Sequence, residues 1–339
     1  MQTSSTGYTS DVRINDWTMH ERRALSGRLR RGEEIDLVVD MASSHPNLPA
    51  LASCIDQIAP LCRTLEAVDP ELRQRAKARL SPAEDLGRCA TVTAVMPCSR
   101  GQPIGVPALL RQDVSVSVLV LSNGAGPREV EGAVVERVTW SGHGATRAAA
   151  IDSVDSEYVL FTVDDAMPLG RGCVGAMVGA LENGPWDAVV ARQIPWPDAD
   201  PVTVERLFEW TPPGTEVVSF SQADHVATLY RTETLRRYPI PPKPIAEDAW
   251  WSRGRRVGYV PTAPFLHSHR RTPLTLYTRN KAIHAELIAM GQSAKISSPL
   301  SALGALPSAL RPALKLDPLE TMNQLAEIAG QWAGSVRVR

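Results

Sequence analysis

The stretch EYVLFTVDDAMP, residues 157–168, joins a strand-like apolar run to two adjacent acids and decides the fold. Its first half, YVLFTV, is a short continuous run rich in β-branched and aromatic residues, typical of a strand buried on both faces. Asp164 and Asp165 follow directly, and neighbouring carboxylates repel each other. A turn, the start of a helix or a metal ion could each stabilise two adjacent acids at this position.

The segments around this stretch alternate between strand and helix patterns. The runs TVTAVMP (91–97) and VSVSVLVLS (114–122) are rich in β-branched residues, and segments rich in Ala, Leu and charge separate such runs. This alternation predicts an α/β fold with a parallel sheet. Ligands bind such sheets at the carboxyl ends of the strands, so functional residues are expected in CSRG, NGAG and DDAMP.

Helical patterns flank the strand patterns on both sides. Residues 1–89 contain LPALASCIDQIAPLCRTLEAV, whose apolar positions recur every three or four residues. Residues 90–270 hold the strand runs, and residues 271–339 return to helical periodicity with proline breaks. We therefore expect an N-terminal helical region, a central α/β domain and a C-terminal helical tail.

Composition and charge exclude several classes of protein. Lys plus Arg (36) balance Asp plus Glu (37) in the 339 residues, which argues against nucleic-acid binding. The five cysteines never form a C-x-x-C spacing, so neither a disulfide framework nor a structural zinc site is expected. The polar N-terminus lacks a signal-peptide core, and no apolar run reaches about 18 residues. We expect a cytoplasmic protein without a transmembrane segment; a peripheral membrane contact and a homodimer stay open.

A second acidic pair, Glu247-Asp248, lies in PIAEDAWWSRGRRVGY. Acids that open a helix are favoured by the helix dipole alone. The alternative is catalytic, because the pair follows a proline-rich loop and precedes Trp250 and Trp251. A partly apolar cleft raises the pKa of a carboxylate, which suits a general base, and Asp248 is the candidate.

Two further motifs are candidates for holding a metal or a phosphate. In FLHSHRR, His267 and His269 share one face of an extended segment, and imidazole is a ligand for Mn²⁺-like ions as well as a common structural group. The glycine-rich turn in GHGATRAAAIDSV leads into a helical Ala run and is a weak candidate for a phosphate cradle.

Several segments follow one another in the order TVTAVMPCSR, ALLRQDVSVSVLVLSNG, GHGATRAAAIDSVDSEYVLFTVDDAMP, VVARQIPWPDADP and EDAWWSRGRRVGYVPTAPFLHSH. In this order, over residues 91–290, they resemble inverting nucleotide-sugar glycosyltransferases of the GT-A fold, in the rhamnosyltransferase-like branch. The resemblance implies a Rossmann-like mixed sheet and a catalytic domain over residues 90–270.

The resemblance also implies roles for particular residues. Asp165 would bind Mg²⁺ or Mn²⁺ together with His267 or His269, of which His267 is preferred. Asp248 would be the catalytic base and Glu247 its acidic companion. The implied donor-binding residues are Pro97, Ser99, Arg100, Ser122, Asn123, Arg147, Asp164, Asp165 and Gln193, and the implied acceptor-side residues are Trp250 and Trp251.

Two positions depart from the pattern of this family. Ser122-Asn123 stands where the family commonly has an acidic pair that holds the nucleoside, and TVDD replaces a clean D-x-D. The expected reaction is inverting transfer of a sugar, by resemblance a rhamnosyl group, to an acceptor hydroxyl in glycan or natural-product glycoside biosynthesis. The alternatives are a nucleotidyltransferase, which would need a lysine in the loop PCSRGQP, and a non-catalytic sugar- or partner-binding protein, which the Ser122-Asn123 replacement would suit.

Overall fold

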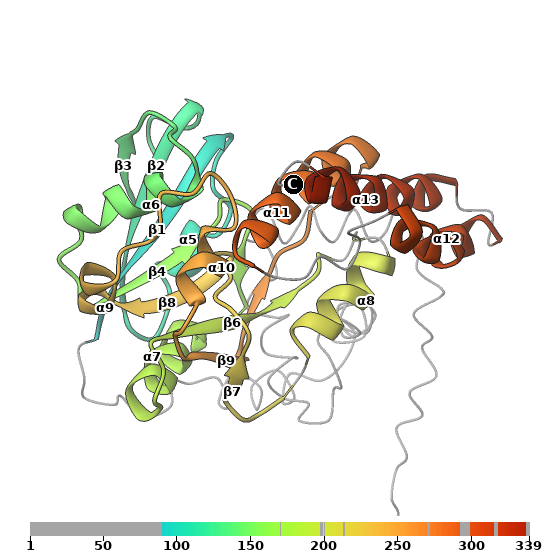
Figure 1. Cartoon of the computed structure of the whole chain (residues 1–339). Coiled ribbons are helices and arrows are strands. Elements are labelled where there is room, and N and C mark those ends of the chain that lie inside the picture. The colour runs from blue at the N-terminus through green and yellow to red at the C-terminus, as the bar shows by residue number, and fades with distance from the viewer. Residues whose placement is uncertain are drawn as a thin grey trace, which may run out of the picture.

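A computed structural model describes residues 90–169, 171–196, 199, 201–212, 214–269, 272–291, 299–314 and 318–336 (Figure 1). The N-terminal helical region predicted for residues 1–89 lies outside these residues, as do Arg270 and Arg271 beside the histidine motif. Among the described helices, none is both long enough and apolar enough to cross a bilayer.

One mixed sheet of nine strands forms the centre of the molecule, in the order β3-β2-β1-β4-β8-β6-β9-β5, with β7 paired to β9. β3, β2, β1 and β4 run parallel, as the alternating pattern predicts, and so do β6 and β9. β8 instead runs antiparallel to both β4 and β6. It follows β7 without a crossover helix, so the βαβ rule that enforces parallel pairing does not apply to it. The strands are β1 (Thr91–Arg100), β2 (Ser115–Ala125), β3 (Val134–Arg137), β4 (Tyr158–Thr162), β5 (Met167–Pro168), β6 (Ala188–Ile194), β7 (Val218–Phe220), β8 (Ala227–Arg231) and β9 (Val257–Leu266).

Helices pack on both faces of this sheet, and α11, α12 and α13 follow its last strand, β9, in the chain. The α/β class and the mixed sheet are therefore as expected. The helices are α5 (Val106–Leu109), α6 (His143–Ala150), the short 3₁₀ helix η2 (Ile151–Ser153), α7 (Cys173–Asn183), α8 (Pro201–Trp210), α9 (Thr232–Arg237), α10 (Glu247–Ser252), α11 (Pro273–Ala289), α12 (Pro299–Leu314) and α13 (Pro318–Val336).

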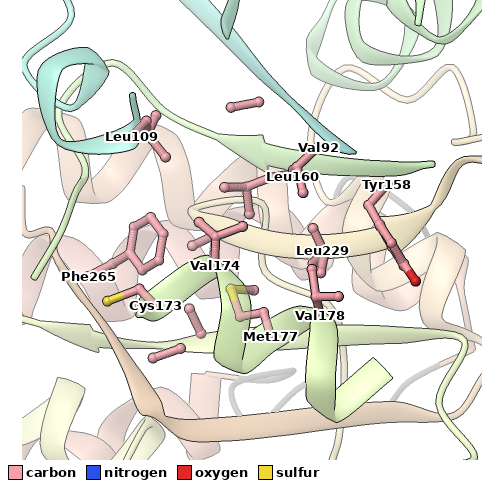
Figure 2. Packing of buried hydrophobic residues seen from close by; sticks show 14 of the residues in the cluster. Val92, Leu109, Tyr158, Leu160, Cys173, Val174, Met177, Val178, Leu229 and Phe265 are labelled. Carbon is pink, nitrogen blue, oxygen red and sulfur yellow. The ribbon is translucent and has the colours of Figure 1, made fainter. Parts of the chain in front are cut away.

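The core has two parts, one on each face of the sheet, because side chains alternate along a strand. Leu160 of β4 belongs to the cluster that contains Val174 and Met177 of α7, shown in Figure 2. Its neighbour Phe161 belongs to the opposite cluster, with Trp251 of α10. The strand is thus buried on both faces, as its continuous apolar sequence predicts, and its carboxyl end is held rigidly.

The C-terminal helices α11 and α13 pack closely through glycines. A Cβ atom added at Gly330 would overlap the backbone carbonyl of Tyr277, and one at Gly334 would overlap that of Lys281. Small residues at these two positions, four apart on one face of α13, allow the two backbones to approach. Both helices contact the rest of the described chain: Trp250 of α10 donates to Glu286 of α11, and Arg206 of α8 forms an ion pair with Glu327 of α13 at 2.7 Å.

Candidate active site

The acid Asp165 and the two histidines are brought together by strand pairing. Asp165 lies two residues before Met167 of β5, and Met167 pairs with Leu266 at the end of β9. His267 follows Leu266 directly, and its backbone N–H donates to the carbonyl of Ile194 at 2.8 Å. Antiparallel pairing therefore places Asp165 opposite the HSH motif at the edge of the sheet.

Asp165, His267 and His269 form a cluster with the geometry of a cation site. Their candidate ligand atoms all lie within 4.8 Å of one another, with 3.6 Å between Asp165 Oδ1 and His267 Nε2 and 3.3 Å between Asp165 Oδ2 and His269 Nδ1. Asp165 Oδ1 and His267 Nε2 are buried and have no hydrogen-bond partner among the described residues. Such orphaned polar atoms are costly, and a divalent cation between them would satisfy both.

The protonation of this cluster also suits a cation. Burial and the positive charge of His269 lower the pKa of His267 to about 4, so its imidazole is neutral near pH 7. Burial by itself would raise the pKa of Asp165, but the hydrogen bond from His269 and the charges of both histidines outweigh it, and the pKa is lowered. The site therefore offers a carboxylate and a neutral imidazole at the same pH.

Asp164 points away from this cluster, towards the end of β1. Burial and the negative charge of Asp165 raise its pKa, and hydrogen bonds from the Cys98 thiol and the Ser99 backbone N–H only partly offset that rise. Its own backbone carbonyl accepts from Ile104 N at 3.0 Å. The side chains of Asp164 and Asp165 thus have different surroundings: Asp164 lies against the end of β1, and Asp165 lies against the two histidines.

Glu247, the first acid of the second pair, is buried in an ion pair. Its Oε1 accepts from Arg147 Nη1 at 2.7 Å and from His225 Nδ1 at 3.0 Å, and His225 Nε2 lies 2.9 Å from the Tyr230 hydroxyl. Burial would raise the pKa of Glu247, but the bonds and charges of His225 and Arg147 lower it to about 2. Glu247 therefore anchors the start of α10 as a permanent anion.

Arg147 is consequently not where the resemblance implied. We expected it to face the donor, whereas its guanidinium is buried against Glu247 and stacks near the Phe161 ring, 5.9 Å from the ring centroid. A buried carboxylate needs a cationic partner, and Arg147 is the residue that supplies it. Its role is to hold α6 to α10.

Asp248 follows Glu247 in the chain and has the opposite electrostatic setting. Burial and the negative charges of Asp224 and Glu247 raise its pKa, although the charge of His225 acts against them. The side chain is half-buried, and none of the ion pairs among the described residues involves it. Asp248 is thus a carboxylate with an elevated affinity for a proton, as a general base requires.

The residue before this pair adopts a conformation that L-residues avoid. Ala246, the N-cap of α10, has φ 58°, and it is the one non-glycine residue with positive φ in the described part of the chain. A left-handed backbone costs about 1–2 kcal/mol for a residue with a Cβ. The ion pair of Glu247, immediately after it, helps to hold the turn in this conformation.

The glycine-rich turn supports the loop that leads into α10. The backbone N–H groups of His143 and Gly144 already donate to the carbonyls of Pro244 and Lys243, at 3.4 and 2.9 Å. A Cβ at Gly144 would overlap the Pro241 carbonyl, so glycine is required for this close approach. These two donors, in the turn considered as a phosphate cradle, thus hold the loop that precedes the acidic pair.

The two tryptophans after the acidic pair have separate environments. Trp251 is buried, donates from Nε1 to the Tyr238 carbonyl at 2.8 Å and packs edge-on against Tyr230. It is a core residue, whereas the resemblance implied a place on the acceptor side. Trp250 is half-buried and donates from Nε1 to Glu286 Oε2 of α11 at 3.0 Å. This hydrogen bond joins α10 to α11, which lie next to each other in Figure 1.

The polar residues Ser122 and Asn123, near the carboxyl end of β2, are bonded to neighbouring protein groups. Ser122 is fully buried, and its hydroxyl donates to the Pro127 carbonyl at 2.6 Å and accepts from Arg137 Nη1 at 2.9 Å. Asn123 donates from Nδ2 to the Cys98 carbonyl at 3.4 Å. Ser122 is therefore poorly placed to read a nucleoside, contrary to the implied role. The sequence reasoning missed Arg137, since a single arginine in a short strand carries no distinguishing pattern.

The remaining implied donor residues lie in the carboxyl-terminal part of β1. Pro97 is half-buried within the sheet, where it pairs with Leu121, while Ser99 and Arg100 are exposed at the carboxyl end of the strand. This exposed end is the edge towards which Asp164 points. Ser99 and Arg100 therefore stay candidates for contacts with a donor.

Gln193 links the cation cluster to a residue that the sequence did not single out. Its Nε2 donates to Asp224 Oδ2 at 2.6 Å, and its Oε1 lies 3.0 Å from His267 Nδ1. We expected Gln193 to face the donor, but both ends of its amide are occupied by protein groups. Asp224 precedes β8 in SQADHVATLY, where an acid at a turn is too common to be a signal.

Comparisons with known proteins agree with this architecture. No protein-family model matches the chain. The O-antigen chain rhamnosyltransferase WbaN of Salmonella anatum is 27% identical over 158 residues, covering 40% of this chain and 49% of WbaN. The mannosyltransferase PcManGT from Pyrobaculum calidifontis, solved in complex with GDP-Man and Mn²⁺, superposes with a TM-score of 0.52 at 15% identity, covering 90% of this chain and 98% of PcManGT.

These similarities identify the fold of the chain. The chain has the GT-A fold of nucleotide-sugar glycosyltransferases. The relative most informative about chemistry is WbaN, and the chain matches about half of the length of that enzyme.

Proposed function

We propose that this protein is an inverting glycosyltransferase that moves a sugar from a nucleoside-diphosphate sugar to an acceptor hydroxyl. The observation that carries the proposal is a pair of complementary groups on a GT-A sheet. Asp248 is a carboxylate with a raised pKa, and Asp165 with His267 and His269 forms a cluster with orphaned ligand atoms. Asp224 connects the cluster to Asp248: it accepts a hydrogen bond from Gln193, and its charge raises the pKa of Asp248.

The proposed reaction is a single displacement. The acceptor hydroxyl oxygen attacks the anomeric carbon and forms the new C–O bond, while its proton passes to Asp248. The bond between the anomeric carbon and the phosphate oxygen breaks with its electron pair, so the nucleoside diphosphate leaves from the opposite face. Attack opposite to the leaving group inverts the anomeric configuration.

Asp165, His267 and His269 would hold a divalent cation. When bound, Mg²⁺ or Mn²⁺ would neutralise the developing charge on the diphosphate leaving group. The mixed set of one carboxylate and two imidazoles favours Mn²⁺ over Mg²⁺, which prefers oxygen ligands. The Mn²⁺ in the PcManGT complex supports this assignment.

The similarity to WbaN supports a deoxyhexose as the transferred sugar. A rhamnosyl donor is accordingly the first substrate to test, and glycan or natural-product glycoside assembly is the proposed setting. Trp250, half-buried at the junction of α10 and α11, is the proposed acceptor-side contact. An indole face beside a base suits a sugar ring, which has apolar C–H faces.

The deciding experiment incubates the protein with dTDP-, UDP- and GDP-sugars in the presence of Mn²⁺, Mg²⁺ or EDTA. We expect release of nucleoside diphosphate with at least one donor, loss of release in EDTA and recovery with Mn²⁺. An inverted anomer, read by NMR of the glycoside formed, completes the assignment. Formation of nucleoside triphosphate and sugar 1-phosphate on addition of pyrophosphate would instead indicate nucleotidyl transfer, and binding without turnover would indicate a sugar-binding protein.

A further inference from the structure

Gln193 of β6 is held between two groups that fix the orientation of its amide. The Asp224 carboxylate can only accept a hydrogen bond, so the Gln193 atom 2.6 Å from it must be the NH₂ group. The amide oxygen therefore faces His267 Nδ1 at 3.0 Å. Gln193 is buried, which leaves no solvent to compensate for the reverse orientation.

This orientation determines the tautomer of His267. An amide oxygen accepts, so His267 Nδ1 must carry the proton that it donates. In the neutral ring the lone pair then lies on Nε2, the buried atom without a hydrogen-bond partner among the described residues, 3.6 Å from Asp165 Oδ1. Two lone-pair atoms facing each other bind a cation, whereas the other tautomer would donate a hydrogen bond to Asp165 and fill the place of the cation.

Asp224 is itself held in position. Its Oδ1 accepts from the backbone N–H of Val226 at 3.1 Å, and its own backbone N–H donates to Thr228 Oγ1 at 3.1 Å. Each carboxylate oxygen thus has one assigned N–H donor. The carboxylate is rigid before any ligand binds, which is what a group that orients another requires.

From this chain of contacts we propose that Asp224 is a positioning residue: acting through Gln193, it selects the His267 tautomer that presents Nε2 to the cation. The inference rests on the proposed cation site. It adds to that site a residue 43 positions away in sequence from His267 (267 − 224) that touches neither cation nor substrate. Partners of this kind change metal affinity by about 10–100-fold when removed.

Asp224→Asn is the sharpest test, because asparagine keeps the size and loses one acceptor. One of the two donors, Gln193 Nε2 or Val226 N, must then face an NH₂ group. The Gln193 amide can relieve this by turning over, which brings its NH₂ group to His267 Nδ1 and moves the ring proton to Nε2. We expect Mn²⁺ affinity, measured by EPR on the protein without donor, to fall about tenfold or more.

Three measurements make the test decisive. The ¹⁵N shifts of His267 in the metal-free protein should show Nδ1–H in the wild type and a shift towards Nε2–H in Asp224→Asn. The effect of Asp224→Asn on Mn²⁺ affinity should vanish in a Gln193→Met background, since the path runs through Gln193. Asp113→Asn, which removes a carboxylate that accepts a backbone N–H from Gly175 at 3.2 Å, should leave both readouts unchanged.

Wild-type protein with Nε2–H on His267 would overturn the proposal, as would an Asp224→Asn variant with unchanged Mn²⁺ affinity or an unchanged effect in the Gln193→Met background. A wild type that binds no Mn²⁺ would instead overturn the cation in the proposed function. The tautomer measured without metal would still decide the role of Asp224.

Discussion

Asp164-Asp165 after β4 and Glu247-Asp248 at the start of α10 each place two neighbouring carboxylates in opposite electrostatic settings. The pKa of Asp165 and that of Glu247 are lowered, the first by imidazoles and the second by His225 and Arg147, against the effect of burial. The pKa of Asp164 and that of Asp248 are raised by burial and by the acids beside them.

This difference teaches how one residue type takes several roles. Partners of opposite charge turn an acid into a permanent anion, suited to a cation or to anchoring a helix. The neighbouring acid of each pair is buried among like charges, which gives its carboxylate a stronger affinity for a proton. Of the four acids, Asp248 is therefore the proposed base and Glu247 its anchor.

The largest effect is expected from Asp248→Asn. Loss of a general base lowers turnover by about 10²–10⁴-fold, and donor affinity should change little because the base acts in the transition state. Turnover of the donor and titration calorimetry with the donor measure the two quantities. Asp155→Asn, at an exposed position between η2 and β4, is the control, and an equal loss of donor affinity in Asp248→Asn would contradict the role of base.

Glu247→Gln should mainly affect stability, in contrast to its neighbour. Removing one partner of a buried ion pair costs about 3–5 kcal/mol, because Arg147 is left buried without its anion. Urea unfolding followed by circular dichroism measures the loss. Glu136→Gln, on the exposed edge strand β3, should cost almost nothing; equal stability of the two variants would show that the ion pair does not hold α10.

The stability of the wild type should also depend on pH through Glu247. Its pKa falls from 4.5 to about 2 on folding, so the ionised form stabilises the folded state. This contribution, about 3 kcal/mol, is fully present above pH 4.5 and is lost as the pH falls towards 2. Urea unfolding across this range should show a shallower decline in Glu247→Gln, and parallel curves would refute the assignment.

Substitutions of Asp164 and of Asp165 should differ in their effect on the Mn²⁺ requirement. Asp165→Asn removes a proposed ligand, and we expect kcat/KM to fall about 100-fold, with partial recovery at high Mn²⁺. Asp164→Asn is the matched variant and should leave the Mn²⁺ requirement close to that of the wild type. Donor turnover across a Mn²⁺ series distinguishes them. A larger shift in the Mn²⁺ requirement for Asp164→Asn would exchange the roles of the two acids.

The smallest effect concerns the pH profile of Asp224→Asn at saturating Mn²⁺. Four groups face Asp248, namely His225, Asp224, Glu247 and Tyr230, and the charge of Asp224 raises the pKa of the base. Without that charge the pKa is lower, so the rise of kcat/KM with pH should begin at a lower pH. A profile that stays in place, or moves to higher pH, would remove Asp224 from the electrostatics of the base.

Sequence reasoning succeeded where one short segment carries the signal. The strand 158–162 was recognisable because a strand buried on both faces has a continuous apolar sequence. The acids that follow it lie at the edge of the sheet because the strand ends there. Sequence reasoning did not anticipate the partners of Arg147, Trp251 and Ser122, which are tertiary contacts or belong to a local turn. Arg147 and Glu247 are 100 residues apart, and no local pattern records such a pair.

The sequence by itself therefore determined the α/β class, the strands and the places where functional acids could stand, because periodicity and burial are local properties. The tertiary structure decided which acid of each pair has the surroundings that the proposed site requires. That choice depends on the β5–β9 register, which brings Asp165 to His267, and on the partners of Glu247, which leave Asp248 without an ion pair among the described residues. Electrostatic roles are set by neighbours in space, and those neighbours exist only in the folded chain.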